Sequence, residues 1–313
     1  MPRVSIVMPM LNARRFVRQA IESVLNQDVH DLEIIIVDDG STDGSGTIVR
    51  QIGDARLRLI KGESRGVAAA FNAGLAAARG QFLARCDADD LYTAGRLAWQ
   101  LAWLEAHQEF GAVCGAFSSM DAKGRFLRNL ECGDAAAEIT DELRAGKTRA
   151  SFCTWLVRAD VVRRLGGCRE YFVSAEDIDL QFRLSEACRV WYEPRSCYAY
   201  RLHDASVTHS TSTSLRYFYY ETARRMQKQR LGGAPDDVDR GNGPHVPSEL
   251  QITDARNGSR SHAQELLLGA AWNEHAAGQR IKALRTALRA CLASPINIQA
   301  WRSLGALALR SRA

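Results

Sequence analysis

Three carboxylates lie within four residues of the sequence, directly after a short apolar run. Residues 81–84 read Gln-Phe-Leu-Ala, which favours a buried strand, and Asp87, Asp89 and Asp90 follow. Like charges this close repel one another, so the cluster is costly to hold without a cation. Because Asp87 and Asp89 occupy alternate positions, both can face the same side of a sheet edge. The spacing indicates either a solvated acidic turn or a site where a divalent metal holds a nucleotide diphosphate.

A second polar cluster follows another apolar, β-branched run and begins with Asp38 and Asp39. Residues 38–45 read Asp-Asp-Gly-Ser-Thr-Asp-Gly-Ser. Carboxylates at a strand end can accept hydrogen bonds from a pyrimidine N–H or a sugar hydroxyl, and helix capping is the alternative role. Pro9 and Asn12, which follow the first apolar run, can shape the wall beside them.

A third acidic pair, Glu176 and Asp177, opens a segment in which apolar residues recur at helical spacing. A hydroxyl that attacks a sugar carbon needs a general base, and Asp177 is the candidate. Burial at a cleft can raise a carboxyl pKa by up to about 3–5 units, whereas the helix N-terminus opposes it by only about 0.3–1 kcal/mol. The alternative is that both residues only charge the start of the helix. His203, in a polar stretch over 198–204 expected to be a loop, is a candidate metal ligand or diphosphate contact, or else a structural histidine.

The elements that must position these residues alternate between strand and helix. In chain order we expect a strand at 4–8, a helix at 13–25, strands at 33–37 and 57–60, a helix at 66–79 and a strand at 81–85. This βαβα order predicts an α/β fold with a doubly wound parallel sheet, in which ligands bind beyond the carboxyl ends of the strands. The polar clusters follow such ends, so we expect one shared site.

Three parts are expected along the chain. Residues 1–231 form the α/β domain, with a nucleotide-binding half at about 1–118 and an acceptor half at about 119–231. Residues 232–260 are rich in Gly, Pro, Asp, Asn and Ser and predict a flexible linker. Apolar spacing over 261–313 predicts a C-terminal helical segment.

Composition narrows the class of protein. The chain has 313 residues, a net charge of +5 and 8 cysteines without a C-x-x-C pair. This charge is too small to indicate nucleic-acid binding, and it suits an anionic substrate or an anionic membrane face. The cysteines indicate reduced thiols rather than disulfides or a zinc site. With no signal peptide and no run of about 18 apolar residues, we expect a cytoplasmic protein, at most peripheral at the inner face of the membrane.

Five motifs, in order along residues 3–210, resemble those of family 2 glycosyltransferases with the GT-A fold. Residues 4–12 resemble the start V-S-I-[IV]-[IV]-P-x-Y-N, and residues 37–45 match V-D-D-G-S-T-D-G-S. Residues 87–90 match D-x-D-D, and residues 176–183 resemble E-D-x-D-L-x-x-R. The last resemblance is to Y-R-x-H followed by S-[VI]-S, at residues 200–208.

This resemblance implies a GT-A, Rossmann-like fold with a mostly parallel sheet and flanking helices, to which this chain adds its C-terminal helical appendage. It implies an inverting transferase of hexosyltransferase type, with one displacement at the anomeric carbon and no covalent intermediate. The donor is expected to be a nucleotide-diphospho-sugar, usually a UDP-sugar, used with Mn²⁺ or Mg²⁺. The acceptor is expected to be a glycan or lipid-linked hydroxyl in cell-envelope polysaccharide or glycolipid synthesis.

The resemblance also implies roles for single residues. Asp39 would contact the base, Asp87 and Asp89 the ribose and the metal, and Asp177 would be the general base. The expected nucleotide-binding residues are Pro9, Asn12, Asp38, Asp39, Arg65 and Asp87. The expected metal ligands are Asp89 and His203, and the secondary candidates are Asp90, Glu176 and Arg201.

Two positions depart from the family pattern, and two other classes of protein compete with it. Leu11 replaces a tyrosine that could stack on the base, and Phe71 replaces a frequent arginine, for which Arg65 is the candidate substitute. These departures leave room for a metal-dependent sugar-nucleotide-binding protein without turnover. A nucleotidyltransferase of related fold would need a glycine-rich phosphate loop after the first strand, where residues 9–12 contain no glycine.

Overall fold

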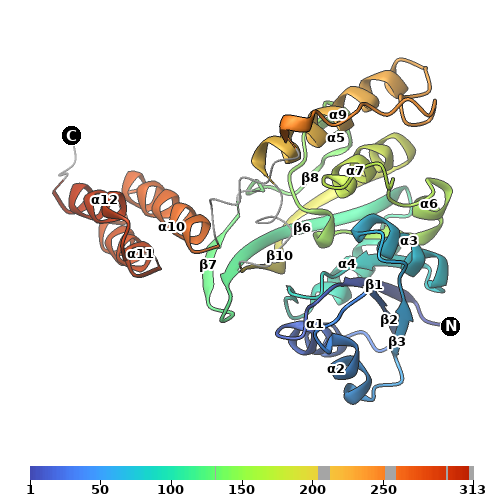
Figure 1. Ribbon diagram of the computed structural model, residues 1–313, viewed down its shortest axis with the longest axis horizontal. Helices are drawn as coiled ribbons and strands as arrows, with labels where there is room; N and C mark the ends of the chain where they lie inside the picture. The colour runs from blue at the N-terminus through green and yellow to red at the C-terminus, as the bar shows by residue number, and fades with distance from the viewer. Residues whose placement is uncertain (131, 204–211, 251–258, 294, 310–313) are drawn as a thin grey trace. The chain divides into compact units, whose positions relative to one another are not determined.

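The computed structural model describes residues 1–130, 132–203, 212–250, 259–293 and 295–309 (Figure 1). The chain divides into two compact units. Unit 1 consists of Met1–Phe117, Glu131–Tyr200 and Thr213–Leu250. Unit 2 consists of Ser118–Leu130, Arg201–Ser212 and Gln251–Ala313. The expected domain at 1–231 therefore corresponds to unit 1 only in part, because unit 1 leaves out residues 118–130 and 201–212 and takes in residues up to 250.

The first half of the sheet in unit 1 is parallel, as the sequence predicted. Its elements are β1 (Val4–Met10), α1 (Val17–Leu25), β2 (Leu32–Asp38), α2 (Ser45–Ile52), β3 (Leu57–Lys61), α3 (Val67–Ala77) and β4 (Phe82–Arg85). The strand order is β3-β2-β1-β4, and Ile6 of β1 pairs with Ile34 of β2 and Ala84 of β4. The polar residues expected at strand ends, at 9–12, 38–45 and 87–90, therefore lie along one edge of this sheet.

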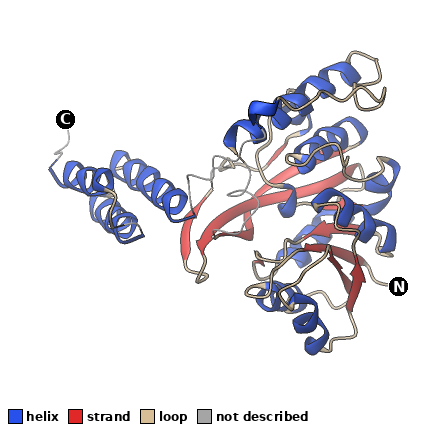
Figure 2. Cartoon of the chain, viewed as in Figure 1, coloured by secondary structure: helices blue, strands red, loops and turns tan. Residues whose placement is uncertain are grey.

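Alternation along β1 explains why helices cover both faces of the sheet. Ile6 and Met8 belong to a core cluster with residues of α1, α2 and α4 (Arg96–Ala106), whereas Val7 belongs to a second cluster with residues of α3, α6 (Ala159–Arg164) and α7 (Glu176–Ala187). Successive side chains of a strand point to opposite faces, so a strand buried on both sides is apolar throughout. Figure 2 shows the strands in red and the helices around them in blue. The predicted doubly wound α/β fold is confirmed.

The second half of the sheet continues with antiparallel neighbours. Its elements are β5 (Leu91–Tyr92), α4 (Arg96–Ala106), β6 (Phe110–Asp121), β8 (Ala137–Glu138), α5 (Thr140–Arg144), η1 (Phe152–Thr154), β9 (Leu156–Arg158), α6 (Ala159–Arg164), α7 (Glu176–Ala187) and β10 (Arg189–Leu202). Strand β9 lies between β4 and β6 and is antiparallel to both, and the order continues as β6-β10-β5. The loop expected over 198–204 is wrong for residues 198–202, which form the end of β10; residue 204 lies outside the described part of the chain.

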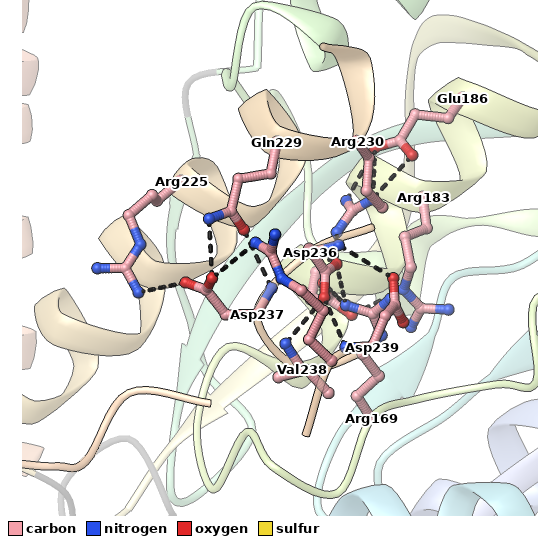
Figure 3. Close-up of polar contacts among 12 residues, drawn as sticks. Arg169, Arg183, Glu186, Arg225, Gln229, Arg230, Asp236, Asp237, Val238 and Asp239 are labelled. Atoms are coloured by element: carbon pink, nitrogen blue, oxygen red, sulfur yellow. Dashed lines mark hydrogen bonds and ion pairs between the residues drawn. The ribbon is translucent and has the colours of Figure 1, made fainter. Parts of the chain in front are cut away.

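The last part of unit 1 holds α9 (Thr213–Leu231) against α7 and ends in the short helix η2 (Ser248–Leu250). Asp236 is fully buried and forms ion pairs with Arg169 and Arg230, and the hydroxyl of Tyr171 donates to the carbonyl of Pro244 at 2.7 Å. Figure 3 shows Arg169 and Arg230 converging on Asp236. The flexible linker expected over 232–260 is therefore wrong for 236–244, and residues 251–258 lie outside the described part of the chain.

Unit 2 contains β7 (Phe126–Asn129) and three helices, α10 (Ser259–Ala276), α11 (Arg280–Ala293) and α12 (Ile298–Leu309). Ala271, Ala287 and Leu307 form its apolar centre. The amide of Asn297 donates to Gln264 at 2.6 Å, and Gln264 donates to the carbonyl of Ala290 at 2.9 Å. These contacts agree with the helical segment expected at 261–313. Among the described residues, no helix combines the length and apolar content that crossing a bilayer requires.

Candidate functional site

The turns after β1 and β2 are tied together by hydrogen bonds. Asn12, in the left-handed region with φ of 51°, donates from its backbone N–H to Ser41 Oγ at 2.9 Å. Its side-chain oxygen accepts from the Thr42 N–H at 2.9 Å. Asp38 accepts from the Ser41 N–H at 2.9 Å, so its carboxylate shapes its own turn. Pro9 is half-buried one residue before the end of β1, and the expected role of these residues as a wall of the nucleotide site stays a prediction.

Asp39 is buried and holds the turn between β3 and α3. Its carboxylate accepts backbone N–H groups from Ser64 and Gly66, both at 2.8 Å. A side chain at Gly62 would meet Asp39 Oδ1 at 2.7 Å, so only glycine allows this approach. Arg65 lies in the same turn, is exposed, and pairs with Glu63 at 2.9 Å and with Glu170. Asp39 thus fixes the turn before α3 and does not cap α2, the helix after its own motif, and its contact with a base stays a prediction.

The acidic cluster after β4 is organised by Tyr198 of β10. The Asp87 N–H donates to the Tyr198 hydroxyl oxygen at 3.1 Å, and that hydroxyl donates to Asp90 Oδ2 at 2.8 Å. Asp90 is therefore a buried support, whereas Asp87 and Asp89 are half-buried. Sequence reasoning missed Tyr198 because it placed the residue in a loop.

Arg85 joins the acidic cluster to the start of α7. Its Nε donates to Asp87 Oδ1 at 2.7 Å, and its Nη1 donates to Glu176 Oε1 at 3.0 Å. Arg85 and Glu176 are both buried, and Asp177 is half-buried beside them. The structure therefore brings two of the expected groups, the acids after β4 and the pair that opens α7, to one place. Sequence reasoning also missed Arg85, although a basic residue at the end of an apolar strand was a signal.

The acids at the start of α7 bind protons more strongly than free carboxyls do. Burial raises the pKa of Glu176 to about 7, with a further increase from the Asp177 charge and an opposing effect of Arg85. Burial also raises the pKa of Asp177, which Arg85 lowers and Asp87 raises. A carboxylate whose pKa lies closer to neutrality is a better general base at physiological pH. The electrostatics thus support the role expected for Asp177.

The remaining charged residues of the α7 motif anchor the helix. Asp179 is fully buried and accepts from Arg183 Nε at 2.8 Å, and Arg183 donates to the carbonyl oxygens of Leu165 and Gly167 at 2.9 and 2.7 Å. Ala175, which precedes the helix, has φ of 63°, a conformation that costs energy for a residue with a side chain. We infer that these anchors hold Asp177 in position against that strain.

The donor set after β4 suits a hard divalent cation. Among the described residues no group of three or more His, Cys, Asp and Glu gathers as a metal site. Mg²⁺ and comparable ions need only one or two protein carboxylates when phosphate oxygens and water complete the shell, and Asp87 and Asp89 can supply these. Arg201 and His203 are buried within unit 2, and their expected part in the site stays a prediction.

Comparison with known sequences identifies the family. The model of the family described as Glycosyl transferase family 2 matches residues 5–166, more than half of the chain. The glycosyltransferase EpsJ of Bacillus subtilis is 33% identical over 222 residues, which cover 66% of this chain and 63% of EpsJ. The chondroitin synthase of Pasteurella multocida is 25% identical over 234 residues, which cover 74% of this chain and 24% of that protein. The chain spans less than two thirds of the length of these two relatives.

Solved structures show the same fold at lower identity. S. aureus TarS 1–349 in complex with UDP-GlcNAc has a TM-score of 0.60 and 17% identity, over 85% of this chain and 83% of TarS. The mannosyltransferase PcManGT of Pyrobaculum calidifontis, in complex with GDP-Man and Mn²⁺, has a TM-score of 0.52 and 22% identity, over 98% of this chain and 86% of that chain. The family match, the ordered motifs and this shared GT-A fold together show that the chain belongs to glycosyl transferase family 2.

Proposed function

We propose that this protein transfers a sugar from a nucleotide-diphospho-sugar to a hydroxyl acceptor with inversion at the anomeric carbon. The observation that carries the proposal is the junction at Arg85, which joins Asp87 of the acidic cluster to the Glu176–Asp177 pair at the start of α7. A nucleotide-binding protein without turnover needs the first group but has no use for a base in the second. The junction therefore favours the enzyme.

In the proposed reaction, Asp177 accepts the proton of the acceptor hydroxyl while the hydroxyl oxygen forms a bond to the anomeric carbon. The bond from that carbon to the diphosphate oxygen breaks on the opposite face, which inverts the configuration. Asp87 and Asp89 would hold Mn²⁺ or Mg²⁺, which neutralises the charge that develops on the leaving diphosphate. Arg85 would keep Asp87 oriented by its hydrogen bond at 2.7 Å.

For the donor we propose a UDP-sugar, with Asp39, Asn12 and Pro9 on the nucleotide side of the site. The structure of TarS, a structural neighbour, holds UDP-GlcNAc, whereas that of PcManGT holds GDP-Man. The absence of a tyrosine at Leu11 removes one contact to the base, so Asp39 and the turn it holds carry more of the recognition.

For the acceptor we propose a glycan or lipid-linked glycan in cell-envelope polysaccharide or glycolipid synthesis, built at the inner face of the membrane. The similarity to a chondroitin synthase, which is named for a polysaccharide, supports this class of product. An exposed apolar stripe on α11, formed by Ile281, Leu288 and Leu292, supports peripheral membrane contact. Arg285 and Arg289 lie beside this stripe in helical spacing, which suits an anionic lipid surface.

Thermal unfolding with UDP, GDP, CDP and ADP, each with Mn²⁺ and with EDTA, tests the proposal. We expect UDP with Mn²⁺ to raise the melting temperature, since ligand at about 100 times its Kd stabilises by about 2.7 kcal/mol. Asp89→Ala should abolish the shift, whereas Asp177→Ala should keep the shift and lose transfer. Full transfer activity in Asp177→Ala would contradict the assignment of Asp177 as the base. If another nucleotide raises the melting temperature instead of UDP, that nucleotide replaces UDP as the proposed donor nucleotide.

A further inference from the structure

A groove of about 700 Å³ lies along one face of α9 and reaches η2. Its lining includes Tyr217, Phe218, Glu221 and Arg225 of α9 and Leu250 of η2. The α9 residues recur three and four positions apart, so they share one face of the helix. We propose that this groove binds the sugar chain of the acceptor, an inference that rests on the transferase function proposed above.

The side chains of the groove suit a carbohydrate. Tyr217 is 64% exposed and Phe218 is half-buried, so aromatic surface is offered to solvent where a solvent-facing helix would ordinarily be polar. Sites for small polar ligands combine such aromatic surface with a few oriented polar groups. A pyranose offers C–H groups on its ring faces and hydroxyls at its edge, which match aromatic rings, the Glu221 carboxylate and the Arg225 guanidinium.

The charges of the groove argue against an anionic ligand. Glu221 and Arg225 have opposite charge, and Arg225 is already paired with Asp237 at 2.8 Å. The Glu221 carboxylate accepts from Arg224 at 3.0 Å and keeps further acceptor positions. Among the described lining residues the charges of Glu221 and Arg225 cancel, so a neutral sugar chain fits better than a diphosphate or a sulfated chain.

Packing connects the groove to the proposed catalytic base. Phe218, which lines the groove, packs against an apolar cluster that includes Ala175 and Tyr219. Ile178 packs against the same cluster. Ala175 and Ile178 flank Glu176 and Asp177 in sequence, so one apolar cluster contacts both Phe218 of the groove and the start of α7.

Ion pairs fix α9 in place, so the groove exists before a ligand arrives. Arg230 of α9 pairs with Glu186 of α7 at 2.8 Å, and both Arg230 and Arg169 pair with Asp236. Figure 3 shows that Asp237 also faces α9, where Arg225 and Gln229 donate to it. A preformed site loses less entropy when it binds a flexible chain.

Glycan binding and donor binding are measured separately on Tyr217→Ala, Tyr217→Phe and a control, Phe126→Ala. The control removes an aromatic ring that is 53% exposed in unit 2. The probe is an array of α- and β-linked hexose and N-acetylhexosamine oligosaccharides of two to six sugars, beside phosphatidylglycerol vesicles. Donor binding is followed by the thermal shift with UDP and Mn²⁺.

We expect Tyr217→Ala to bind the array sugars about tenfold more weakly, the effect of losing about 1.4 kcal/mol of aromatic contact. Tyr217→Phe and Phe126→Ala should bind as wild type, and all variants should keep the UDP shift. The inference is overturned if wild type binds no array sugar, if Tyr217→Ala binds undiminished, or if only vesicles are bound. Tyr217-dependent sugar binding without any nucleotide shift would retain the groove and reject the proposed transferase function.

Discussion

Removal of Arg85 should shift the pH dependence of activity, because this guanidinium offsets the charge of the acids around it. Arg85 contacts Asp87 at 2.7 Å and Glu176 at 3.0 Å, and it lowers the pKa of both Glu176 and Asp177 against the effect of burial. An opposite charge at such distances lowers a carboxyl pKa by about 1–3 units, or about 1.4 kcal/mol per unit. In Arg85→Leu the acidic limb of kcat/KM, where the base must lose its proton, should therefore move up by about 1–3 units.

The stability of Arg85→Leu should depend on pH for the same reason. The folded-state pKa of Glu176, about 7, lies above its ordinary value of 4.5, so the stability that its protonated form contributes is present below 4.5 and is lost as the pH rises through 7. Breaking a buried ion pair costs about 3–5 kcal/mol. We expect that cost at pH 8 and a smaller one at pH 5, where Glu176 is protonated, as measured by denaturant unfolding.

Arg96→Leu provides the matched control for a second buried arginine. Arg96 donates to Gln100 at 2.9 Å and to the carbonyl of Trp155 at 3.1 Å, so its hydrogen bonds go to neutral groups. Loss of Arg96 should destabilise the fold and leave the acidic limb at its wild-type pH. Arg85→Lys keeps a positive charge, so its acidic limb should lie between those of wild type and Arg85→Leu. An acidic limb that stays at the wild-type pH in Arg85→Leu would refute the coupling between Arg85 and Asp177.

Four further outcomes follow from the contacts described. Asp177→Asn should lower kcat by about 10²–10⁴, as loss of a general base does, without reducing the UDP shift in a melting assay. Tyr198→Phe leaves Asp90 and the Asp87 N–H without a shared hydroxyl, so it should cost about 1–3 kcal/mol in denaturant unfolding and weaken the metal-dependent UDP shift. Burial opposes ionisation of Asp236, yet hydrogen bonds led by that from Arg169 lower its pKa to about 2. The ionised carboxylate should therefore stabilise the fold above pH 3.8, and this stabilisation should be lost as the pH falls through 2. Asp236→Asn should show no such loss. Serine at the three stripe positions of α11 should abolish flotation with anionic vesicles, while binding that survives would contradict membrane contact through this stripe.

The parallel half of the fold could be predicted because its physical signals are local. Apolar β-branched runs in β1 and β2 and the helical stripe of α1 each specify their own structure, and βαβ order then specifies the sheet. The antiparallel half carries weaker signals, since the end of β10 mixes serine, tyrosine and arginine with apolar residues and shows neither a continuous apolar run nor a regular alternation. Polar composition over 236–244 likewise suggests a linker, although Asp236 is buried and pairs with Arg230 and with Arg169, which is distant in sequence.

The sequence predicted which residues lie near the candidate site better than it predicted what each of them does there. Asp38, Asp39, Asp90 and Asp179 all belong to motifs, yet each carboxylate accepts hydrogen bonds that fix a turn or a helix. A sequence motif indicates that a carboxylate is needed, but it does not indicate whether that carboxylate binds a ligand or another group of the protein. Only tertiary contacts make that distinction, and they depend on residues such as Tyr198 that lie far along the chain.

The same contacts change what the acidic cluster says about a metal. From sequence, the repulsion among Asp87, Asp89 and Asp90 indicates that a cation is required. In the structure Arg85 already supplies a positive charge to Asp87, and the Tyr198 hydroxyl satisfies Asp90. Self-repulsion therefore no longer demands an ion. The case for Mn²⁺ or Mg²⁺ depends instead on a nucleotide diphosphate, whose negative charge would meet half-buried carboxylates and would need a cation between them. We therefore expect the metal ion and the nucleotide diphosphate to bind together, each one requiring the other.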